Sequence, residues 1–231
     1  MLYYHIGSGA EAFTAGRNDQ LPYHVIQGHQ IHKDHIAVIE RPDTTREELE
    51  GYDAFVTQLP DCAIGVRTAD CVPVLLYDPV RRVVAAVHSG WRSTVLRISQ
   101  KTIQLMTERF GTSPSDLIAI IGPCICHDSY QVGKEVIDAF IEAGFDAHCW
   151  TKDKPTASNC CNGQSEGNDV KYHLDLWIAN TDVLMDAGVE LHNIRIAGIC
   201  TFTDENYYSA RREGNQHDKR NINAIRLTVS E

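Results

Sequence analysis

The sequence predicts an α/β protein in which mixed β-sheets are covered by helices. Short β-branched runs, typical of strands, occur as a hairpin at 72–78 and 83–88 and elsewhere alternate with amphipathic helical segments. This alternation favours a helix-covered sheet over a helix bundle or a pure sandwich. The chain has 231 residues, 43% of them hydrophobic, which is enough for one domain with a core of its own.

The expected strands are short apolar runs rich in β-branched side chains. In chain order they are HIAVIE (35–40), CAIGV (62–66), VPVLLYD (72–78), VVAAVH (83–88), DLIAIIGP (116–123) and NIRIAGIC (193–200). A last strand-like run closes the C-terminal tail.

Helical spacing of apolar residues marks three further segments. They are 93–111, 133–144 and 174–188. In the first of them, Ser93 is expected to cap the start and Gly111 the end. The polar segment 146–168 is rich in turn residues and reads as an inserted loop within a single domain spanning 1–231.

The charge balance restricts the partners that we expect. The formal net charge is −10, which argues against a nucleic-acid partner, because phosphate backbones are bound by clustered basic surfaces. No run approaches the roughly 18 apolar residues of a membrane span. The N-terminal residues lack the features of a signal peptide, so the expected location is cytoplasmic, with no membrane partner. Eight cysteines without a CxxC spacing do not suggest a disulfide scaffold.

The hairpin places two metal-binding residue types at matching ends. If Asp78 pairs with Arg81, then Cys71 faces His88, with Cα atoms about 4.5–5.5 Å apart. Pro79 cannot adopt the positive φ of the usual two-residue turn, so a longer loop is plausible. A register shift of two would leave Cys71 diagonal to His88 and within reach of a shared ion, whereas a shift of one would separate them.

A thiolate and an imidazole on one face suit zinc or copper. Two ligands make a weak site, so a third has to come from elsewhere. The stretch QGHQIHKDH offers His29, His32 and His35, and spacing alone does not choose among them. The structural alternative is a buried core cysteine and a hydrogen-bonded histidine at a strand end.

An ordered set of motifs covers most of the chain from about residue 30 onward. These are Q-I-H at 30–32, T-A-D-C-V-P-V at 68–74, V-H-S-G-W-R at 87–92, a G-P…Y-x-V-G segment at 122–133, D-L-W at 175–177 and C-T…S-x-R-R ending at 212. The set resembles the laccase-domain proteins, also called polyphenol-oxidase-like proteins and, more recently, purine nucleoside phosphorylases of that fold.

The resemblance implies a four-layer α/β/β/α fold with mixed sheets and a metal site. Its implied ligands are His32, Cys71 and His88, which leave one position open for water or substrate, as in catalytic zinc sites. The implied cofactor is Zn²⁺, with copper as an option. The implied reaction is phosphorolysis of a purine nucleoside (adenosine, inosine or guanosine) to base and ribose 1-phosphate, with adenosine deamination as a possible additional activity.

Some positions depart from the family pattern. The N-terminal region is shorter than in most members, and Phe13 to Arg17 only partly match the usual Gly-rich stretch. Ser93 stands where the family has glycine after H-x-G-W-R, and the late G-R motif near the C-terminus reads Lys219-Arg220. None of these departures touches the three implied ligands, so they bear on the substrate more than on the metal.

The two reactions require different groups. Deamination needs a metal-activated water and an acid that shuttles protons, for which Asp70 is the candidate. Asp70 and its cysteine neighbour would point to opposite faces of a regular strand, which weakens that candidacy. Phosphorolysis needs cations, and Arg92 is the catalytic and phosphate-binding candidate, with Arg211 and Arg212 as further phosphate ligands. Surface salt bridges are the alternative role for these arginines.

Three other functions fit part of the pattern. A copper-binding polyphenol oxidase is one, although the 11 histidines include no HxH motif. A non-enzymatic metal-binding module would need a fourth protein ligand, such as Cys62 or His35. A cysteine hydrolase would use Cys71 as nucleophile and His88 as base.

Overall fold

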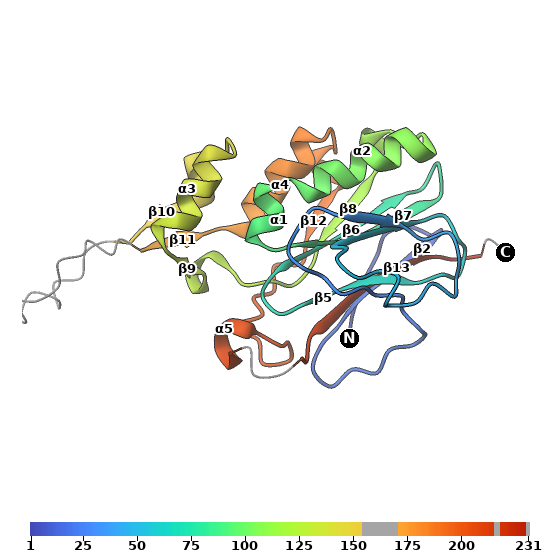
Figure 1. The fold of residues 1–231 in the computed structure, drawn as a ribbon, viewed down its shortest axis with the longest axis horizontal. Coiled ribbons are helices and arrows are strands. Elements are labelled where there is room, and N and C mark those ends of the chain that lie inside the picture. Colours follow the sequence, from blue (N-terminus) through green and yellow to red (C-terminus); the bar gives the residue numbers. More distant parts are fainter. Residues whose placement is uncertain (154–170, 215–217, 230–231) are drawn as a thin grey trace, which may run out of the picture.

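The computed structural model describes residues 1–153, 171–214 and 218–229 (Figure 1). Its centre is a six-stranded sheet with the order β12-β8-β6-β7-β4-β3. The strands are β3 (Ile36–Val38), β4 (Ala54–Thr57), β6 (Val72–Asp78), β7 (Val83–Ser89), β8 (Ile118–Ile121) and β12 (Ile194–Ile196). The edge pairs β3–β4 and β12–β8 are parallel and the inner pairs antiparallel, so the sheet is mixed, as predicted.

A second, antiparallel sheet packs against one face of the first. Its order is β1-β2-β13-β5, formed by β1 (Leu2–Tyr4), β2 (Ala10–Ala15), β5 (Ile64–Thr68) and β13 (Asn221–Leu227). Because side chains alternate along a strand, Leu75 and Val84 face this second sheet and share a buried cluster with Ile225. Strand β13, near the C-terminus, lies between β2 and β5, so it connects the N-terminal strands β1 and β2 to the rest of this sheet.

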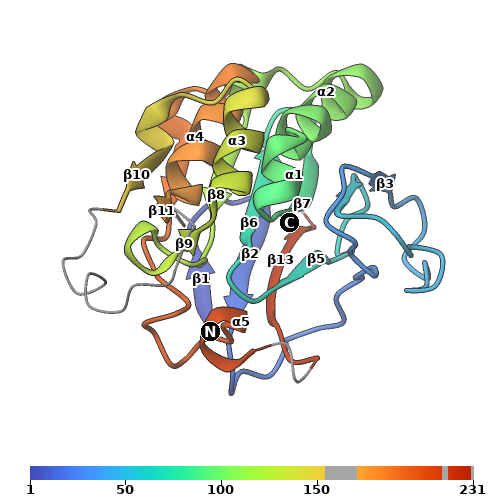
Figure 2. The ribbon, with the colours of Figure 1, turned by 60° about the vertical axis from the view of Figure 1, so that its left-hand side comes forward.

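Helices cover the opposite face of the six-stranded sheet (Figures 1 and 2). They are α1 (Trp91–Val95), α2 (Ile98–Phe110), α3 (Lys134–Glu142) and α4 (Leu176–Asp186). Val74 and Leu76 point to this side and share a core with Met106 of α2 and Leu184 of α4. A small sheet of the order β10-β11-β9 lies beside α3; its strands are β9 (Gln131–Val132), β10 (Trp150–Lys152) and β11 (Tyr172–Leu174).

The predicted α/β class with mixed sheets is confirmed. Of the four layers α/β/β/α that the resemblance implies, the described residues form three in succession: the helices, the six-stranded sheet and the four-stranded sheet. On the outer face of the four-stranded sheet, Phe13 and Ala224 are covered by Val25 and Tyr23 from the loop after β2. The short helix α5 (Ala210–Glu213) lies close to the start of β13 in the chain.

The hairpin β6–β7 has the longer loop expected from its proline. The register pairs Asp78 with Val83, so residues 79–82 form the turn. The pairing is therefore shifted by two relative to the shortest hairpin. Cys71 lies just before β6 and diagonal to His88, which is the register that keeps both side chains on one side of the hairpin.

The first predicted helix is two helices, and the expected cap is wrong. Arg97 has a φ of 56° and separates α1 from α2. Its guanidinium bonds the Asp186 carboxylate at 2.8 Å, a tertiary contact that the helical pattern does not encode. The N-cap of α1 is Gly90, and Ser93 lies inside that helix. The stop at Gly111 is confirmed, with a φ of 71°.

Part of the predicted loop 146–168 is ordered structure. Its first residues form the 3₁₀ turn Ala147–Cys149 and strand β10, because Trp150 pairs with Leu174 of β11. Residues 154–168 of this prediction lie outside the described residues. Within the described chain, each helix is too short or too polar to cross a bilayer.

Candidate metal centre and its pocket

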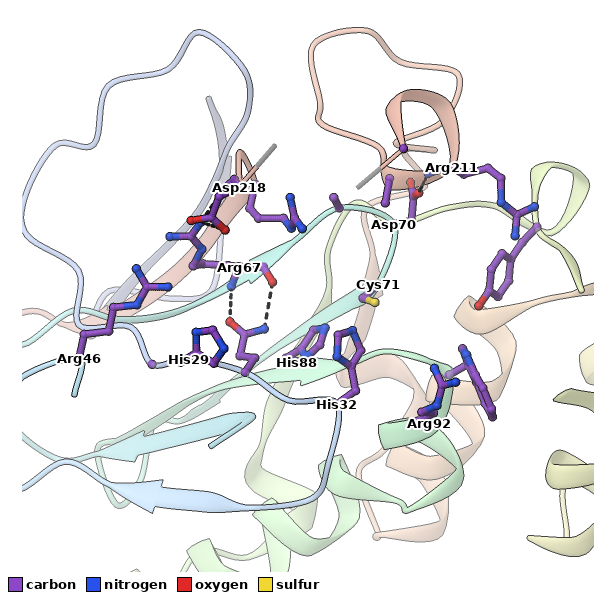
Figure 3. A pocket seen from close by; sticks show the side chains of 18 residues that line it. His29, His32, Arg46, Arg67, Asp70, Cys71, His88, Arg92, Arg211 and Asp218 are labelled. Atoms are coloured by element: carbon purple, nitrogen blue, oxygen red, sulfur yellow. Dashed lines mark hydrogen bonds and ion pairs between the residues drawn. The ribbon is translucent and has the colours of Figure 1, made fainter. Parts of the chain in front are cut away.

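Three side chains from distant segments meet at one point. The ligand atoms of His32, Cys71 and His88 all lie within 4.8 Å of one another. His32 comes from the loop before β3, Cys71 from the turn before β6 and His88 from β7, and Figure 3 shows their side chains converging. The structure therefore selects His32 from the three histidines that spacing left open.

A buried carboxylate holds two of these residues in place. Asp53 accepts hydrogen bonds from the backbone amides of Ile31, His32 and Lys33, at 3.2, 3.0 and 2.9 Å. These bonds fix a loop in which His32 has a φ of 59°, an uncommon value for a residue other than glycine. The same carboxylate bonds Nδ1 of His88 at 2.7 Å, which leaves Nε2 free to bind a metal, the usual arrangement around metal-ligating histidines.

Asp53 is a residue of the site that no local sequence pattern marks. It stands one residue before β4, a strand that becomes the neighbour of β7 only after folding. Its burial is complete, and hydrogen bonds from His88 and from the Lys33 amide outweigh that burial and lower the pKa of the carboxyl. Asp53 is therefore an anion at neutral pH and a fixed hydrogen-bond acceptor for the site.

Gly90 makes room for the ligands. A Cβ at this position would lie 2.8 Å from Sγ of Cys71 and 3.3 Å from Cδ2 of His32. The glycine of the V-H-S-G-W-R motif is therefore explained by space, since its φ of −66° is open to any residue. Two imidazoles and a thiolate in such a cradle fit zinc or copper as a donor set.

The charges within the group favour a thiolate. Burial opposes ionisation of Cys71, but attraction to His88 and hydrogen bonds from both histidines lower the pKa of the thiol to about 6. Burial likewise opposes the charge on His88, but the Cys71 thiolate and Asp53 raise the pKa of that imidazole to about 9. The thiolate is the form that binds metal ions and the form that acts as a nucleophile.

The metal-binding group lies in the wall of a cavity of about 600 Å³, a size typical of ligand pockets. Trp91 and Tyr130 also line it. The lining also includes two aspartates, Asp70 and Asp218, and five arginines: Arg46, Arg67, Arg92, Arg211 and Arg220. In a chain with a net charge of −10, this concentration of guanidinium groups indicates an anionic ligand.

Two of the three predicted phosphate ligands line the pocket. The Arg92 guanidinium stacks on Trp91, 4.2 Å from the ring centroid. Arg211 donates to the carbonyl oxygen of Gln131 at 3.0 Å and lies over the ring of Tyr130 at 5.4 Å. Figure 3 shows both arginines on the same side of the metal-binding group.

Arg212 points elsewhere. Its guanidinium donates to the carbonyl oxygens of Thr201 and Phe202, at 2.9 and 2.8 Å, and pairs with Glu213. Successive residues of a helix point about 100° apart, so α5 can direct only one of its two arginines into the pocket. Arg212 therefore holds the 201–207 loop in place, and its position does not support the predicted phosphate contact.

Asp70 lines the pocket but is already engaged. One carboxylate oxygen accepts a bond from the Thr201 hydroxyl and the other from the backbone amide of Arg211, both at 2.7 Å. Asp70 has a φ of 86°, and the chain turns there between β5 and the cysteine ligand. The geometry makes Asp70 the anchor of α5, and a role in proton transfer would have to compete with these bonds.

Together, the fold and the site define an α/β protein with a candidate metal-binding group (His32, Cys71 and His88) in the wall of an arginine-rich pocket. The family model described as multi-copper polyphenol oxidoreductase laccase matches residues 13–228. The chain belongs to this family, which confirms the resemblance drawn from the sequence motifs.

The chain is also similar to named relatives. It is 36% identical over 222 residues to a purine nucleoside phosphorylase of Bacteroides thetaiotaomicron, covering 90% of this chain and 78% of that one. It is 36% identical over 197 residues to the adenosine deaminase RL5 of an unknown prokaryotic organism, covering 82% and 70%.

Solved structures agree on the fold. The Bacillus licheniformis hypothetical protein YfiH superposes with a TM-score of 0.76 at 28% identity, over 88% of this chain and 74% of that one. YlmD of Geobacillus stearothermophilus superposes with a TM-score of 0.75 at 26% identity, over 89% and 74%.

Proposed function

We propose that this chain is a zinc-dependent purine nucleoside phosphorylase that acts on adenosine, inosine or guanosine. The observation that carries the proposal is the presence of a three-ligand metal group and five arginines in one pocket. Phosphorolysis requires phosphate and a nucleoside in the same cavity, and a hydrolytic deaminase has no need for phosphate-binding cations. The name of the Bacteroides thetaiotaomicron relative supports the same reaction.

His32, Cys71 and His88 would hold the zinc ion and leave one coordination position for water or substrate. Zinc would supply Lewis-acid chemistry toward an oxygen of the substrate or of water. Asp53 fixes the orientation of His88 and the loop that carries His32. The aromatic face of Tyr130 offers a stacking surface for a purine or ribose.

In phosphorolysis a phosphate oxygen bonds to C1′ of the ribose while the C1′–N9 bond breaks, and the purine leaves with the bonding electrons. The guanidinium groups of Arg92 and Arg211 would hold the phosphate dianion next to C1′ and remove part of its water shell. The free purine would then take a proton from solvent or from a pocket group.

A second candidate is adenosine deamination, favoured by the name of the RL5 relative and by the carboxylate in the pocket. It would need water as nucleophile and an acid near the leaving amine. Asp70 would fill that role only by giving up a bond to Thr201 or to the Arg211 amide.

The other candidates use less of the site. A copper-dependent oxidation of phenols would leave the five arginines without a role. A non-enzymatic metal module would need a fourth side chain, and the described chain supplies three at this group. A cysteine hydrolase fits the contact between Cys71 and His88, and tight zinc binding by that thiolate would rule it out.

Product analysis separates these reactions. Zinc-loaded protein is incubated with adenosine, with and without phosphate, beside the variant Cys71→Ala. Adenine that forms only with phosphate and is lost in the variant supports the phosphorylase. Inosine that forms without phosphate supports the deaminase, and the absence of both products from zinc-loaded protein contradicts both proposals.

A further inference from the structure

A second group of arginines lies in the pocket, across the metal-binding group from Arg92 and Arg211. It consists of Arg46, Arg67 and Arg220. Figure 3 shows Arg46 and Arg67 on the side opposite Arg92 and Arg211, with His32 and His88 between the two sides. The pocket therefore has a basic wall at each end, and phosphorolysis of a simple nucleoside needs only one.

The fold brings these three residues together from distant segments. Arg46 is in the loop between β3 and β4, Arg67 is in β5, and Arg220 immediately precedes β13. Arg67 pairs with Ile222 of β13, so Arg220, two residues earlier, is its diagonal neighbour across the two strands. Burial and the nearby charges of Arg46 and Arg220 lower the pKa of Arg67, while Asp218 acts in the opposite direction, so Arg46 and Arg220 each lie within electrostatic range of Arg67.

One carboxylate belongs to this wall. Asp218 forms an ion pair with Arg67 at 3.1 Å and, among the described residues, is the only acidic group lining this side. Arg67 also donates to the carbonyl oxygen of Asp218 at 2.6 Å, and Arg220 donates to that of Lys219 at 2.8 Å, so bonds within the chain hold two of the three guanidinium groups in place. A phosphoryl group suits such a site, since each guanidinium can donate two parallel hydrogen bonds to its oxygens.

Hydrogen bonds also connect Arg67 to the segment that carries His32. The side-chain amide of Gln30 donates to the carbonyl oxygen of Arg67 at 2.9 Å and accepts from its backbone amide at 2.8 Å. Gln30 stands two residues before His32, so this pair of bonds fixes Arg67 relative to a metal ligand. The glutamine of the Q-I-H motif thus aligns two parts of one pocket.

A second cavity adjoins this group of arginines. Arg46 and Arg67 also line an adjoining cavity of about 410 Å³, together with Thr44 and Thr45. A phosphoryl group between the two cavities can be bare or can carry a substituent.

We propose that Arg46, Arg67 and Arg220 form a phosphoryl-binding subsite of the nucleoside pocket. The occupant is a phosphate dianion, either inorganic phosphate or the 5′-phosphate of a purine nucleotide. The proposal rests on the proposed function in that the purine and ribose lie between this wall and the metal-binding group.

The test is calorimetric binding of inorganic phosphate and of adenosine 5′-monophosphate, each measured separately on zinc-loaded protein at fixed ionic strength. The variant is Arg46→Gln with Arg220→Gln, which leaves the bonds between Gln30 and Arg67 intact. The matched control is Arg41→Gln: Arg41 lies in the same loop as Arg46 but pairs with Glu48 outside the pocket. Circular dichroism confirms that both variants are folded.

The double variant is expected to bind at least one anion about tenfold more weakly or worse, because each lost guanidinium removes charge-assisted hydrogen bonds. The Arg41→Gln control is expected to stay within about twofold of the wild type. Weakening for inorganic phosphate identifies the occupant as the co-substrate and moves the phosphate-binding role from Arg92 and Arg211 to this wall. Weakening for the nucleotide alone identifies the occupant as a substrate phosphate and leaves the co-substrate with Arg92 and Arg211. Unchanged binding of both anions by the double variant, or binding of neither by the wild type at millimolar concentration, overturns the subsite.

Adenine formation from adenosine and phosphate, measured on the same samples, separates the two proposals. Anion binding that depends on Arg46 and Arg220, in protein that forms no adenine, refutes the phosphorylase and leaves the subsite intact. Normal adenine formation together with unchanged anion binding in the double variant refutes the subsite and leaves the phosphorylase intact.

Discussion

Two groups of side chains in this molecule offer nearly the same types of metal ligand, but the pKa of the cysteine thiol is lowered in one group and raised in the other. His32, Cys71 and His88 meet in the pocket, while His148, Cys149 and Asp182 meet on the helical side, again with ligand atoms within 4.8 Å of one another. Contact with histidines lowers the pKa of the first thiol to about 6, whereas burial and Asp182 raise that of the second to about 12.

The position of the carboxylate accounts for the difference. In the pocket, Asp53 lies behind His88 and bonds its Nδ1, so the face of the imidazole toward Cys71 carries positive charge. In the second group, Asp182 is itself the contact, 2.8 Å from Nε2 of His148 and 3.5 Å from the thiol of Cys149. Proximity of donors alone therefore does not make a thiolate; an acid placed behind the histidine favours ionisation, and an acid beside the thiol opposes it.

The largest expected effect comes from removing each thiol. Cys71→Ala is expected to lose stoichiometric zinc after dialysis, because two imidazoles on their own make a weak site. Cys149→Ala is expected to keep wild-type zinc. Elemental analysis of both dialysed variants checks this, and equal metal loss in the two would remove the distinction between the groups.

Asp53→Asn tests the support behind the histidine. Loss of its charge is expected to weaken zinc binding by about 10- to 100-fold, the range seen when the hydrogen-bond partner of a ligating histidine is changed. The matched variant Asp182→Asn should bind zinc as the wild type does. Competition with a chromophoric chelator measures both affinities, and an unchanged affinity in Asp53→Asn would contradict the role given to this carboxylate.

Gly90→Ala tests the space around the ligands. The added Cβ would lie 2.8 Å from Sγ of Cys71, so the ligands or the backbone must move. We expect a loss of about 1–3 kcal/mol in the free energy of unfolding, the range for overpacking a buried site. Urea denaturation with and without zinc measures the loss. Zinc affinity equal to that of the wild type would show that the ligands accommodate the added methyl group without weaker metal binding.

The pH dependence of stability separates the groups in metal-free protein. The pKa of His88 rises from 6.5 to about 9, so its contribution is complete below 6.5 and is lost as the pH rises through 9. The pKa of Cys71 falls from 9.0 to about 6, so its contribution is complete above 9.0 and is lost as the pH falls through 6. Because the two shifts arise largely from one charge pair, their joint stabilisation is greatest between about 6 and about 9.

Denaturation of metal-free protein at pH 5, 7.5 and 10 is expected to show the largest contribution of this pair to the free energy of unfolding at pH 7.5. Cys71→Ser is expected to remove that maximum. Cys149→Ser serves as the control and should retain the window of the wild type. A wild-type profile no more curved than that of Cys71→Ser would contradict the thiolate–imidazolium pair.

The smallest effect is expected from His148→Ala. Its side chain is half exposed, and ion pairs in such positions contribute about 0–1 kcal/mol. We expect no change in zinc content and a shift of the unfolding free energy within that range. A fall in zinc stoichiometry would show that the second group binds metal as well.

Much of the fold was predictable because it depends on local patterns. Strands β6 and β7 were placed within a residue of their ends, since each is a continuous apolar run. The stop of α2 at Gly111 followed from a glycine in the left-handed conformation. Strand β2, with the sequence AEAFTA, was missed because its burial comes from pairing with β13, more than 200 residues away in the chain.

The site was partly predictable for the same reason. Cys71 and His88 followed from the hairpin, and the motif resemblance added His32. The resemblance could not show that Arg212 turns away from the pocket, since adjacent residues of a short helix diverge. It also gave no role to Arg46 or Arg67, and it noted Arg220 only as part of the late G-R motif that reads Lys219-Arg220 here.

The sequence by itself determined the hairpin and the covering helices and named three candidate metal ligands, because these depend on periodicity and on the side chains that the motifs name. Only the tertiary structure showed that the three candidate ligands meet at one point, that Asp53 bonds His88 from behind, and that five arginines share the pocket. The reason is physical: hydrogen bonds and electrostatic fields act across a few ångströms of space, and the segments that come this close are set by the pairing and packing of strands distant in the chain.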